Sequence, residues 1–380
     1  MHEGPVVVFA GGGTGGHLYP ALALADELVR QRPDVRTFFL GARRGIEARV
    51  LPERSLEHRL LPVRGVRRGE WWSNLGVPFA LASSVATTIG VHRRIRPEMV
   101  VVTGGYAAAA AGIGAGLMGI PLILQEQNSL PGVVTRFLTR WACRVHVAFP
   151  EAIERLPVTT AQVLLTGNPV RPLSATSRQV ARRAFGVPAD VSLALVVGGS
   201  QGSAALNGVM LKLVESIAEG TIELPETLHF LWATGSQHYD RIFAAVKRAG
   251  APASVHVFSY FEDMPSALVA ADVAVSRAGA MSTAELLNQG LPALLVPLPT
   301  AADDHQTHNA RALARAGAAV IVPESELTAA KLVTKLAHLI SDPDGLDLMR
   351  RRARERARPD AAAEIAADVA SFLSEPRRTP

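Results

Sequence analysis

The residues best suited to chemistry follow a glycine-rich turn near the start of the chain. Gly11, Gly13 and Gly16 match the pattern G-x-G-x-x-G, and His17 follows them directly. Glycines let backbone N–H groups approach an anion, and the N-terminus of a following helix adds partial positive charge. A histidine beside such a site titrates near neutrality and is a candidate general base. The alternative for His17 is a helix-capping or core histidine.

A second turn of the same kind, GGSQGS, occupies residues 198–203. Binding of NAD would require an acidic residue roughly 20 positions after the first turn, but the second expected strand ends in LGARR, without an acid. A P-loop requires Lys followed by Ser or Thr, and neither turn has that pair. For one turn alone, tight packing without a ligand is the alternative. The duplication favours two anion-binding halves.

Polar and small residues also follow two expected strands in the first half. Glu126 and Asn128 come after the apolar run PLIL, and Gly104, Gly105 and Tyr106 end another run. Residues just past the carboxyl ends of parallel strands line the ligand crevice of such sheets. We therefore expect the polar pair to bind sugar hydroxyls, and the glycine pair to widen the pocket or bind a pyrophosphate. Capping of the next helix by Asn128 is the alternative.

In the second half, SRAGAMSTAE (residues 276–285) joins an expected strand to a helix. Glu285 in the first turns of that helix could accept hydrogen bonds from both hydroxyls of a ribose. Ser282 and Thr283, with the helix N-terminus, would then face a phosphate. The alternative is a glutamate that stabilises the helix through its dipole.

Asp303, Asp304, His305 and His308 have a spacing that is compatible with a metal site. No further ligand pattern supports a metal, and Asp or His at a helix start is commonly a cap. We expect neither a metal nor a cofactor. Gln306, which lies among these residues, could instead reach sugar hydroxyls.

Residues 64–79 combine basic and apolar side chains. Basic residues beside Trp and aliphatic residues suit a peripheral membrane surface. The alternative is an amphipathic helix packed on the sheet. Nucleic-acid binding is not expected, because no recognised motif accompanies the segment. The residues concerned are Arg64, Arg67, Arg68, Trp71, Trp72, Leu75, Val77 and Phe79.

These candidates require parallel strands whose carboxyl ends meet. Apolar runs at residues 5–10 and 192–197 each lead into a glycine turn and a helical pattern, and further runs alternate with helices. Such alternation predicts an α/β fold of two Rossmann-like, doubly wound domains. The other strand candidates are residues 37–40, 99–102, 121–124, 145–148, 228–233, 254–258, 273–276, 293–296 and 318–322.

Length and composition agree with this organisation. The 380 residues suit two domains, and 48% of them are hydrophobic. The single Cys143 excludes an intrachain disulfide framework and a cysteine-based zinc site. We expect no signal peptide and no transmembrane helix. The net charge of +5 suits anionic partners without choosing among them. We expect domains at residues 1–168 and 169–343, with C-terminal helices at residues 344–380.

Several motifs, taken together and in order, resemble the MurG family of glycosyltransferases. They are AGGGTGGHLYPALALADEL, TGGY, LILQEQN, TGNPVRP, VVGGSQGS followed by LN, and SRAGAMSTAELLNQGLPALLVPLP. The resemblance extends from about residue 6 to residue 322. It implies the glycosyltransferase B architecture, with two domains facing a cleft, and C-terminal helices at residues 344–380 that pack back on the N-terminal domain.

The resemblance also implies roles for individual residues. UDP-GlcNAc would lie mainly on the second domain, with Ser200 at the diphosphate, the backbone of Phe261 at uracil and Glu285 at the ribose. His17 is the favoured base and Glu126 the second candidate, while Gly104, Gly105 and Tyr106 lie on the acceptor side. The donor would be surrounded by Thr14, Gly15, Gly16, Asn128, Arg171, Ser200, Phe261, Ala280, Met281, Ser282, Thr283, Ala284, Glu285 and Gln306.

The implied reaction is inverting transfer of GlcNAc to the 4-hydroxyl of the MurNAc of lipid I, giving lipid II in peptidoglycan synthesis. The protein would bind peripherally to the anionic cytoplasmic face of the cell membrane, and a complex of cell-wall synthesis proteins is a further expected partner. The sequence departs from the family pattern at Phe261, where an aliphatic residue is common, and in QEQN and HQTHN. Three alternatives stay open: transfer to another lipid acceptor, epimerisation of UDP-GlcNAc, and a non-enzymatic nucleotide-sugar scaffold.

Overall fold

The structure is a computed structural model that describes residues 4–13, 15–63, 65 and 76–374. It divides into two compact units. The first comprises Met1–Val170 and Pro359–Pro380, and the second comprises Arg171–Arg358. Several residues named above lie outside the described part of the chain. They are Thr14, Arg64, Arg67, Arg68, Trp71, Trp72 and Leu75.

The described part of the first unit contains a seven-stranded parallel sheet in the order β3-β2-β1-β4-β5-β6-β7. The strands are β1 (Val6–Gly11), β2 (Arg36–Ala42), β3 (His58–Leu61), β4 (Met99–Gly104), β5 (Leu122–Glu126), β6 (Arg144–Val147) and β7 (Gln162–Leu165). The helices are α1 (Gly15–Gln31), α2 (Glu47–Glu53), α4 (Val77–Ile95), α5 (Gly105–Met118), α6 (Val133–Leu138), η1 (Thr139–Trp141), α7 (Pro150–Ile153) and α16 (Ala361–Ser371).

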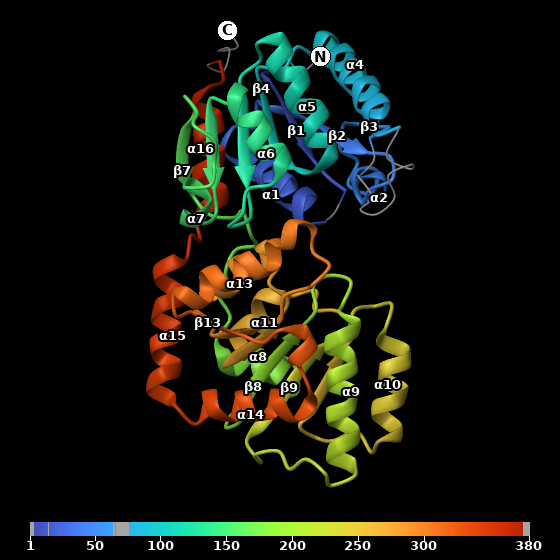
Figure 1. Ribbon diagram of the computed structural model, residues 1–380, viewed down its shortest axis with the longest axis vertical. Helices are drawn as coiled ribbons and strands as arrows, with labels where there is room; N and C mark the ends of the chain where they lie inside the picture. The colour runs from blue at the N-terminus through green and yellow to red at the C-terminus, as the bar shows by residue number, and fades with distance from the viewer. Residues whose placement is uncertain (1–3, 14, 64, 66–75, 375–380) are drawn as a thin grey trace. The chain divides into compact units, whose positions relative to one another are not determined.

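Both faces of this sheet are buried, as expected for parallel strands. Alternate side chains of β1 point to opposite faces: Val7 and Phe9 join a core with residues of α1 and α16, whereas Val8 and Ala10 join a core with residues of α5. Helix α5 consists largely of Ala and Gly, which allows close packing. A Cβ atom at Gly114 would lie 2.8 Å from Thr88 of α4. Figure 1 shows α4 beside α5.

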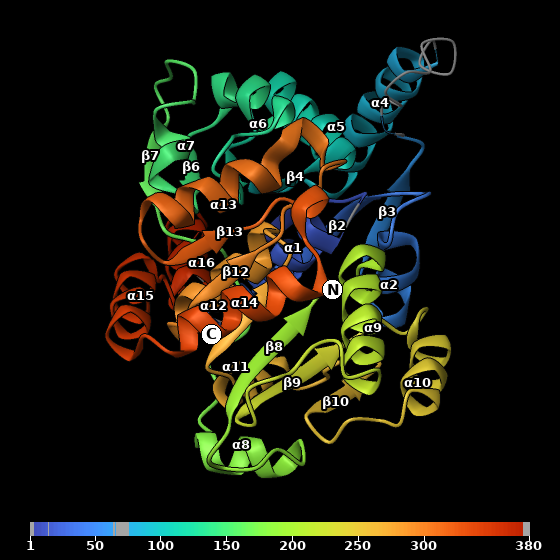
Figure 2. The same cartoon turned by 60° about the horizontal axis from the view of Figure 1, so that its bottom comes forward.

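The described second unit contains a six-stranded parallel sheet in the order β10-β9-β8-β11-β12-β13. Figure 2 shows β8, β9 and β10 running in the same direction. The strands are β8 (Ser192–Val197), β9 (Leu228–Ala233), β10 (Val255–Phe258), β11 (Val273–Ser276), β12 (Ala293–Leu295) and β13 (Ala319–Ile321). The helices are α8 (Arg178–Ala184), α9 (Ala204–Ala218), α10 (Tyr239–Arg248), α11 (Met264–Ala270), α12 (Ala280–Gln289), η2 (Ala302–Asp304), α13 (His305–Arg315), η3 (Glu324–Glu326), α14 (Ala329–Ile340) and α15 (Pro343–Arg356).

The two sheets share one topology. In each, the first strand lies between the second and the fourth, so the strand order reverses beside β1 and beside β8. Ligands of doubly wound sheets bind at such switch points, at the carboxyl ends of the strands. The first glycine turn (residues 11–16) begins at the end of β1, and the second glycine turn (residues 198–203) follows β8. The expected fold class of two Rossmann-like α/β domains is confirmed.

The C-terminal helices divide between the two units, whereas we expected the helices at residues 344–380 to pack back on the first. Helix α15 belongs to the second unit, where Leu346 and Ala353 are buried. Helix α16 belongs to the first unit and adds Ile365 and Val369 to its core. His146 also fixes α16, because its Nε2 lies 3.0 Å from a carboxylate oxygen of Asp368.

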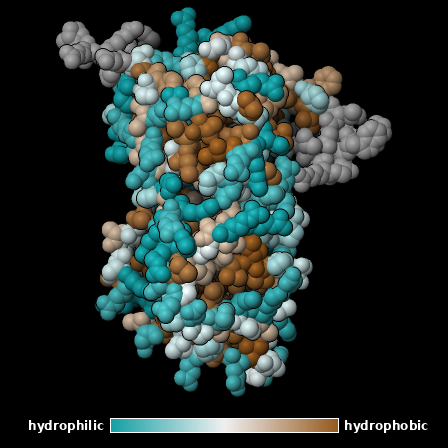
Figure 3. All heavy atoms as spheres, turned by 60° about the vertical axis from the view of Figure 1, so that its left-hand side comes forward, coloured by the Kyte–Doolittle hydropathy of each residue, from teal (hydrophilic) through white to brown (hydrophobic). Residues whose placement is uncertain are grey.

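The surface carries scattered hydrophobic side chains. Figure 3 shows one face, on which hydrophobic areas lie among hydrophilic residues. Among the described residues of the first unit, Phe79 is 79% exposed, Leu117 64% and Val133 60%. Within the described chain, no helix is both long enough and apolar enough to cross a membrane.

Candidate active site

The first glycine turn packs directly on the turn at Gly104 and Gly105. The N–H of Gly12 donates a hydrogen bond to the carbonyl oxygen of Gly104 at 3.2 Å. A Cβ atom at Gly105 would lie 1.9 Å from the carbonyl oxygen of Gly12. Gly13 has φ of 93°, a conformation that favours glycine. The first glycine turn and the Gly104–Gly105 turn are far apart in the sequence. Together they form one surface at the ends of β1 and β4.

His17 lies on this surface. Its carbonyl oxygen accepts a hydrogen bond from the Thr103 hydroxyl at 2.6 Å. Its imidazole lies over Gly104, because a Cβ atom there would come within 3.0 Å of His17 Nε2. The Tyr106 side chain is 41% exposed. Its ring lies near Gly13, because a Cβ atom at Gly13 would be 4.0 Å from the ring, at the limit of van der Waals contact. The structure thus brings His17 together with Gly104, Gly105 and Tyr106.

Glu126 ends β5 and is 3% exposed. One carboxylate oxygen accepts hydrogen bonds from the backbone N–H and side-chain amide of Asn128, at 3.0 and 3.3 Å. The other accepts from the N–H of Gly132 at 3.0 Å and the hydroxyl of Thr135 at 2.6 Å. Both oxygens are therefore engaged in holding the segment that leads into α6. In this arrangement the carboxylate is a structural anchor.

The neighbouring glutamines form a buried network that sequence reasoning missed. Gln125 donates from Nε2 to the side-chain oxygen of Asn168 at 3.0 Å, and Asn168 donates to the carbonyl of Gln127 at 3.1 Å. Gln127 donates from Nε2 to the carbonyl of Thr103 at 2.7 Å. Buried amides are costly unless they are paired. The polar tetrapeptide QEQN therefore fixes its own loop, and Asn128 is its most accessible side chain.

The second glycine turn presents Ser200 at the surface. Gly199 and Gly202 have φ of 88° and 77°. A Cβ atom at Gly202 would lie 2.0 Å from the carbonyl oxygen of Thr234, so the turn packs on the end of β9. Ser203 caps α9 by accepting the N–H of Leu206. The exposed Ser200 and the α9 N-terminus are suitably placed for a phosphate.

Glu285 and Arg171 line one pocket of the second unit. Burial raises the pKa of Glu285 to about 7, and the positive charge of Arg171 opposes part of that shift. The Arg171 guanidinium also donates to the hydroxyl of Tyr260 at 3.3 Å. A carboxylate and a guanidinium beside each other can serve hydroxyl donors and a phosphate, respectively. The lining residues are Arg171, Pro172, Leu173, Pro265, Leu268, Glu285, Asn288 and Gln289.

Residues at the start of α12 differ in accessibility. Ala280, Met281, Ser282 and Ala284 are half-buried, whereas Thr283 is fully buried and donates its hydroxyl to the carbonyl of Ala280 at 2.9 Å. The expectation that the Thr283 side chain faces a phosphate is therefore wrong, because its hydroxyl is directed to the helix backbone.

Phe261 and Gln306 are held by local contacts. The Phe261 side chain is 2% exposed and packs on Phe185 and Phe258, at ring distances of 5.5 and 5.2 Å, which leaves its backbone as the group for a ligand. Gln306 accepts the N–H of Leu298 at 3.0 Å through its side-chain oxygen. Its amide nitrogen donates no hydrogen bond to another described residue and suits a sugar hydroxyl.

The acidic and histidine side chains of η2 and of the start of α13 make local contacts. Asp304 accepts the hydroxyl of Thr307 at 2.6 Å, and Nδ1 of His305 lies 2.6 Å from the carbonyl of Ala302. The described residues contain no group of three or more His, Cys, Asp or Glu side chains that could hold a metal ion.

Arg277 is a positioning residue that sequence reasoning missed. It is 8% exposed, donates to the carbonyls of Val296 and Pro297 at 3.1 and 3.3 Å, and pairs with Glu324. These contacts hold the segment that follows β12, which leads to Leu298 and its bond with Gln306. The sequence feature that could have indicated this role is a single basic residue within the run of small residues SRAGA.

Comparison with known proteins places this site in context. The chain matches the glycosyltransferase family 28 N-terminal domain over residues 7–147 and the C-terminal domain over residues 193–365. It is 39% identical over 353 residues to a UDP-N-acetylglucosamine–N-acetylmuramyl-(pentapeptide) pyrophosphoryl-undecaprenol N-acetylglucosamine transferase of Desulforudis audaxviator, covering 92% of this chain and 93% of that protein. A protein of the same name from Salinibacter ruber is 42% identical over 353 residues, 92% of each chain.

A solved structure gives the same result. The crystal structure of MurG from Acinetobacter baumannii matches with a TM-score of 0.76 and 30% identity, covering 97% of this chain and 99% of that one. Similarity therefore extends over nearly the whole length of both chains, in sequence and in fold.

Proposed function

Since this chain belongs to the MurG family of glycosyltransferases, we propose that it transfers N-acetylglucosamine from UDP-N-acetylglucosamine to the muramyl sugar of lipid I, a pyrophosphoryl-undecaprenol lipid. The product of this step is lipid II, the disaccharide lipid of peptidoglycan synthesis. The observation that carries the proposal is that Arg171 and Glu285 line one pocket, in a chain whose first glycine turn is followed directly by His17.

The second unit binds the donor. Ionised Glu285 accepts hydrogen bonds from the ribose hydroxyls, and the backbone at Phe261 contacts uracil. Arg171, Ser200 and the N-terminus of α12 contact the diphosphate, where a guanidinium and backbone N–H groups stabilise negative charge. The half-buried residues Ala280, Met281, Ser282 and Ala284 line the nucleotide, and the amide nitrogen of Gln306 reaches a sugar hydroxyl.

The first unit supplies the base. The 4-hydroxyl of the acceptor sugar attacks the anomeric carbon of UDP-α-GlcNAc, and His17 takes the proton of that hydroxyl. A new carbon–oxygen bond forms as the bond to the UDP oxygen breaks, which inverts the anomeric configuration to β. UDP leaves with the bonding electrons, and its growing charge is stabilised by preorganised N–H groups. Gly15, Gly16, Gly104, Gly105 and Tyr106 lie on the surface that also presents His17.

The contacts of Glu126 favour His17 as the base. A general base needs a lone pair within hydrogen-bond reach of the proton that it removes. Both oxygens of Glu126 are already engaged with Asn128, Gly132 and Thr135. We assign Glu126 to positioning Asn128, whose side chain faces the substrate.

The lipid acceptor requires access to a membrane surface, and the protein binds peripherally to its cytoplasmic face. Exposed Phe79, Leu117 and Val133 in the first unit support this assignment, since apolar side chains of this kind insert at an interface. Arg140, whose guanidinium lies 4.3 Å from the ring centre of the exposed Phe137, adds positive charge next to a further apolar side chain of the first unit. The sequence of residues 64–75, most of which lie outside the described part of the chain, is basic and contains Trp71 and Trp72, a composition that suits the same role. A complex of cell-wall synthesis proteins would supply the acceptor.

The test is transfer of labelled N-acetylglucosamine to lipid I, compared with the same assay on other undecaprenyl-linked sugars. We expect label in lipid I with stoichiometric release of UDP. Transfer to another sugar lipid in preference to lipid I would identify a different acceptor. Hydrolysis or epimerisation of the donor without any acceptor product would contradict transferase activity.

A further inference from the structure

A buried carboxyl group lies behind the first glycine turn. Glu47, the first residue of α2, is 0% exposed. One of its carboxyl oxygens accepts a hydrogen bond from the backbone N–H of Gly13. The other oxygen, Oε2, is equally buried and has no hydrogen-bond partner among the described residues. An unsatisfied buried oxygen of this kind is costly, and native proteins keep few of them.

Three glycines make room for this side chain. A Cβ atom at Gly12 would lie 1.4 Å from Oε1 of Glu47, and one at Gly45 would lie 1.7 Å from Oε2. A Cβ atom at Gly41 would lie 2.7 Å from the Cβ of Glu47. Any side chain at these positions would displace the carboxyl group. The space that the backbone leaves here is therefore fitted to Glu47.

The hydrogen bond to Gly13 fixes one peptide group of the turn. The N–H of the Gly12–Gly13 peptide points to Glu47, and its carbonyl oxygen lies against Gly105. Glycine on both sides of this peptide would otherwise let it rotate freely. The same turn leads to His17, whose imidazole lies over Gly104. The fixed peptide thus lies in the turn from which α1 begins, and His17 lies in the first turn of that helix.

We propose that Glu47 is a positioning residue for the transfer reaction, holding the Gly12–Gly13 peptide so that His17 meets the acceptor hydroxyl. The proposal rests on the assignment of His17 as the base. Burial raises the pKa of the Glu47 carboxyl group, in keeping with a role that depends on reach and acceptor geometry more than on charge. A neutral amide of the same length at this position should therefore keep the positioning function.

Two substitutions separate the effect of side-chain length at position 47 from the effect of its ionisable group. Glu47→Gln keeps the length and an oxygen for Gly13, but removes the ionisable group. Glu47→Asp keeps the ionisable group, but is one methylene too short to reach Gly13. Because misplacement of a catalytic group by about 1 Å can cost roughly 100-fold in rate, we expect kcat to fall at least about tenfold in the Asp variant and to stay within about threefold of wild type in the Gln variant. Glu53→Gln, at an exposed position of the same helix, is the matched control.

Two further readouts distinguish positioning from simple loss of structure. UDP affinity, which belongs to the second unit, should be unchanged in all variants. We expect the acid limb of the pH profile of kcat to move in the Asp variant, where the His17 imidazole is displaced into other surroundings, and to stay in place in the Gln variant, which keeps the imidazole where it is. A loss of folded protein alone would lower kcat at every pH without moving the acid limb of the profile.

Equal kcat in the Asp variant and wild type would overturn the proposal, and so would a loss in the Gln variant as large as in the Asp variant. A lower kcat in the Asp variant at every pH, with the acid limb of its pH profile unmoved, would also overturn the proposal. These outcomes differ from failure of the proposed function, in which the wild-type protein itself would transfer no sugar to lipid I.

Discussion

At the scale of single residues, Glu285 links burial to ligand recognition. Its pKa is raised to about 7, so that it is largely protonated in mildly acidic solution and largely ionised in mildly alkaline solution. An ionised carboxylate accepts hydrogen bonds from both ribose hydroxyls, whereas the protonated group has one donor and less acceptor capacity. The donor should therefore bind more tightly as the pH rises through 7.

We expect the affinity for UDP-N-acetylglucosamine to increase up to about tenfold between about pH 6 and pH 8, the change in ionised fraction of a group with this pKa. Isothermal titration without acceptor measures it, and the intact sugar nucleotide avoids the terminal phosphate ionisation of UDP. Glu285→Gln should bind weakly with a flat profile, while Glu215→Gln on the exposed face of α9 keeps the slope. An unchanged slope in Glu285→Gln would show that another group titrates.

The sequence places side chains at strand ends and helix starts, but it does not give their direction. Glu126 and Glu285 are both acids beside an expected ligand edge. One is engaged by α6 and its loop, and the other lies in a pocket beside Arg171. Ser282 and Thr283 are neighbours, yet Thr283 bonds to its own helix. These differences depend on side-chain contacts between elements that no local pattern specifies.

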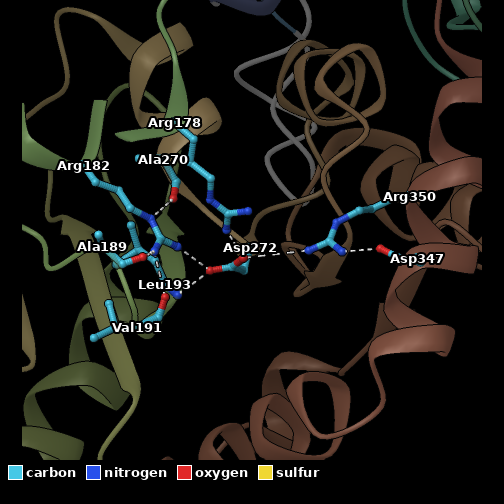
Figure 4. Close-up of polar contacts among 9 residues, drawn as sticks. All are labelled: Arg178, Arg182, Ala189, Val191, Leu193, Ala270, Asp272, Asp347 and Arg350. Carbon is cyan, nitrogen blue, oxygen red and sulfur yellow. Dashed lines mark hydrogen bonds and ion pairs between the residues drawn. The ribbon is translucent and has the colours of Figure 1, made fainter. Parts of the chain in front are cut away.

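At the scale of elements, Asp272 joins three segments of the second unit (Figure 4). It precedes β11 and accepts the N–H of Leu193 at 2.8 Å. It pairs with Arg182 of α8 at 2.7 Å and with Arg178, while Arg350 of α15 lies 3.8 Å away. Burial lowers the pKa of Arg178 to about 10, with the charges of Arg182 and Arg350 acting in the same direction. Asp272 thus offsets the mutual repulsion of these guanidinium groups.

Replacing Asp272 by Asn should destabilise the second unit by about 2 kcal/mol, because partly buried cations lose their counter-ion. Thermal unfolding with UDP absent measures the change. The control Asp347→Asn removes an exposed i,i+3 partner of Arg350 and should cost less than about 0.5 kcal/mol. Equal melting temperatures for the two variants would mean that the arginines are stabilised without Asp272.

The elements themselves were largely predictable. Every strand expected from an apolar run is present, because strands buried on both faces must be apolar throughout. The unpredicted strands β3 (HRLL) and β7 (QVLL) lie at the two edges of the first sheet and carry polar or exposed residues. Composition did not predict which unit each of the C-terminal helices α15 and α16 packs on. Arg354 of α15 packs against Gly290, and Ile365 of α16 enters the other core.

At the scale of the whole molecule, buried histidines contribute to the loss of stability in acid. His92 is 1% exposed, and neither ring nitrogen has a hydrogen-bond partner among the described residues. Burial lowers its pKa from 6.5 to about 4. Burial also lowers the pKa of His146, against the opposing effect of Asp368. Since the unfolded chain takes up a proton near pH 6.5 and the folded chain does not, stability is full above that pH and falls as the pH drops toward 4.

His92 alone should account for about 3 kcal/mol of this loss, from the size of the pKa shift. His92→Leu should therefore reduce the difference between melting temperatures at about pH 7 and pH 4.5. His338→Leu, at an exposed position, should leave that difference as it is in wild type. A His92→Leu protein as acid-sensitive as wild type would place the acid response elsewhere.

The most direct test of the account is the single-turnover rate of N-acetylglucosamine transfer to lipid I by wild type and His17→Ala, with UDP affinity measured on the same samples. The account predicts a rate lower by about 100-fold or more in the variant, the usual contribution of a general base, and UDP affinity equal to wild type. Transfer by His17→Ala at a rate close to wild type would contradict the assignment of the base and the mechanism built on it.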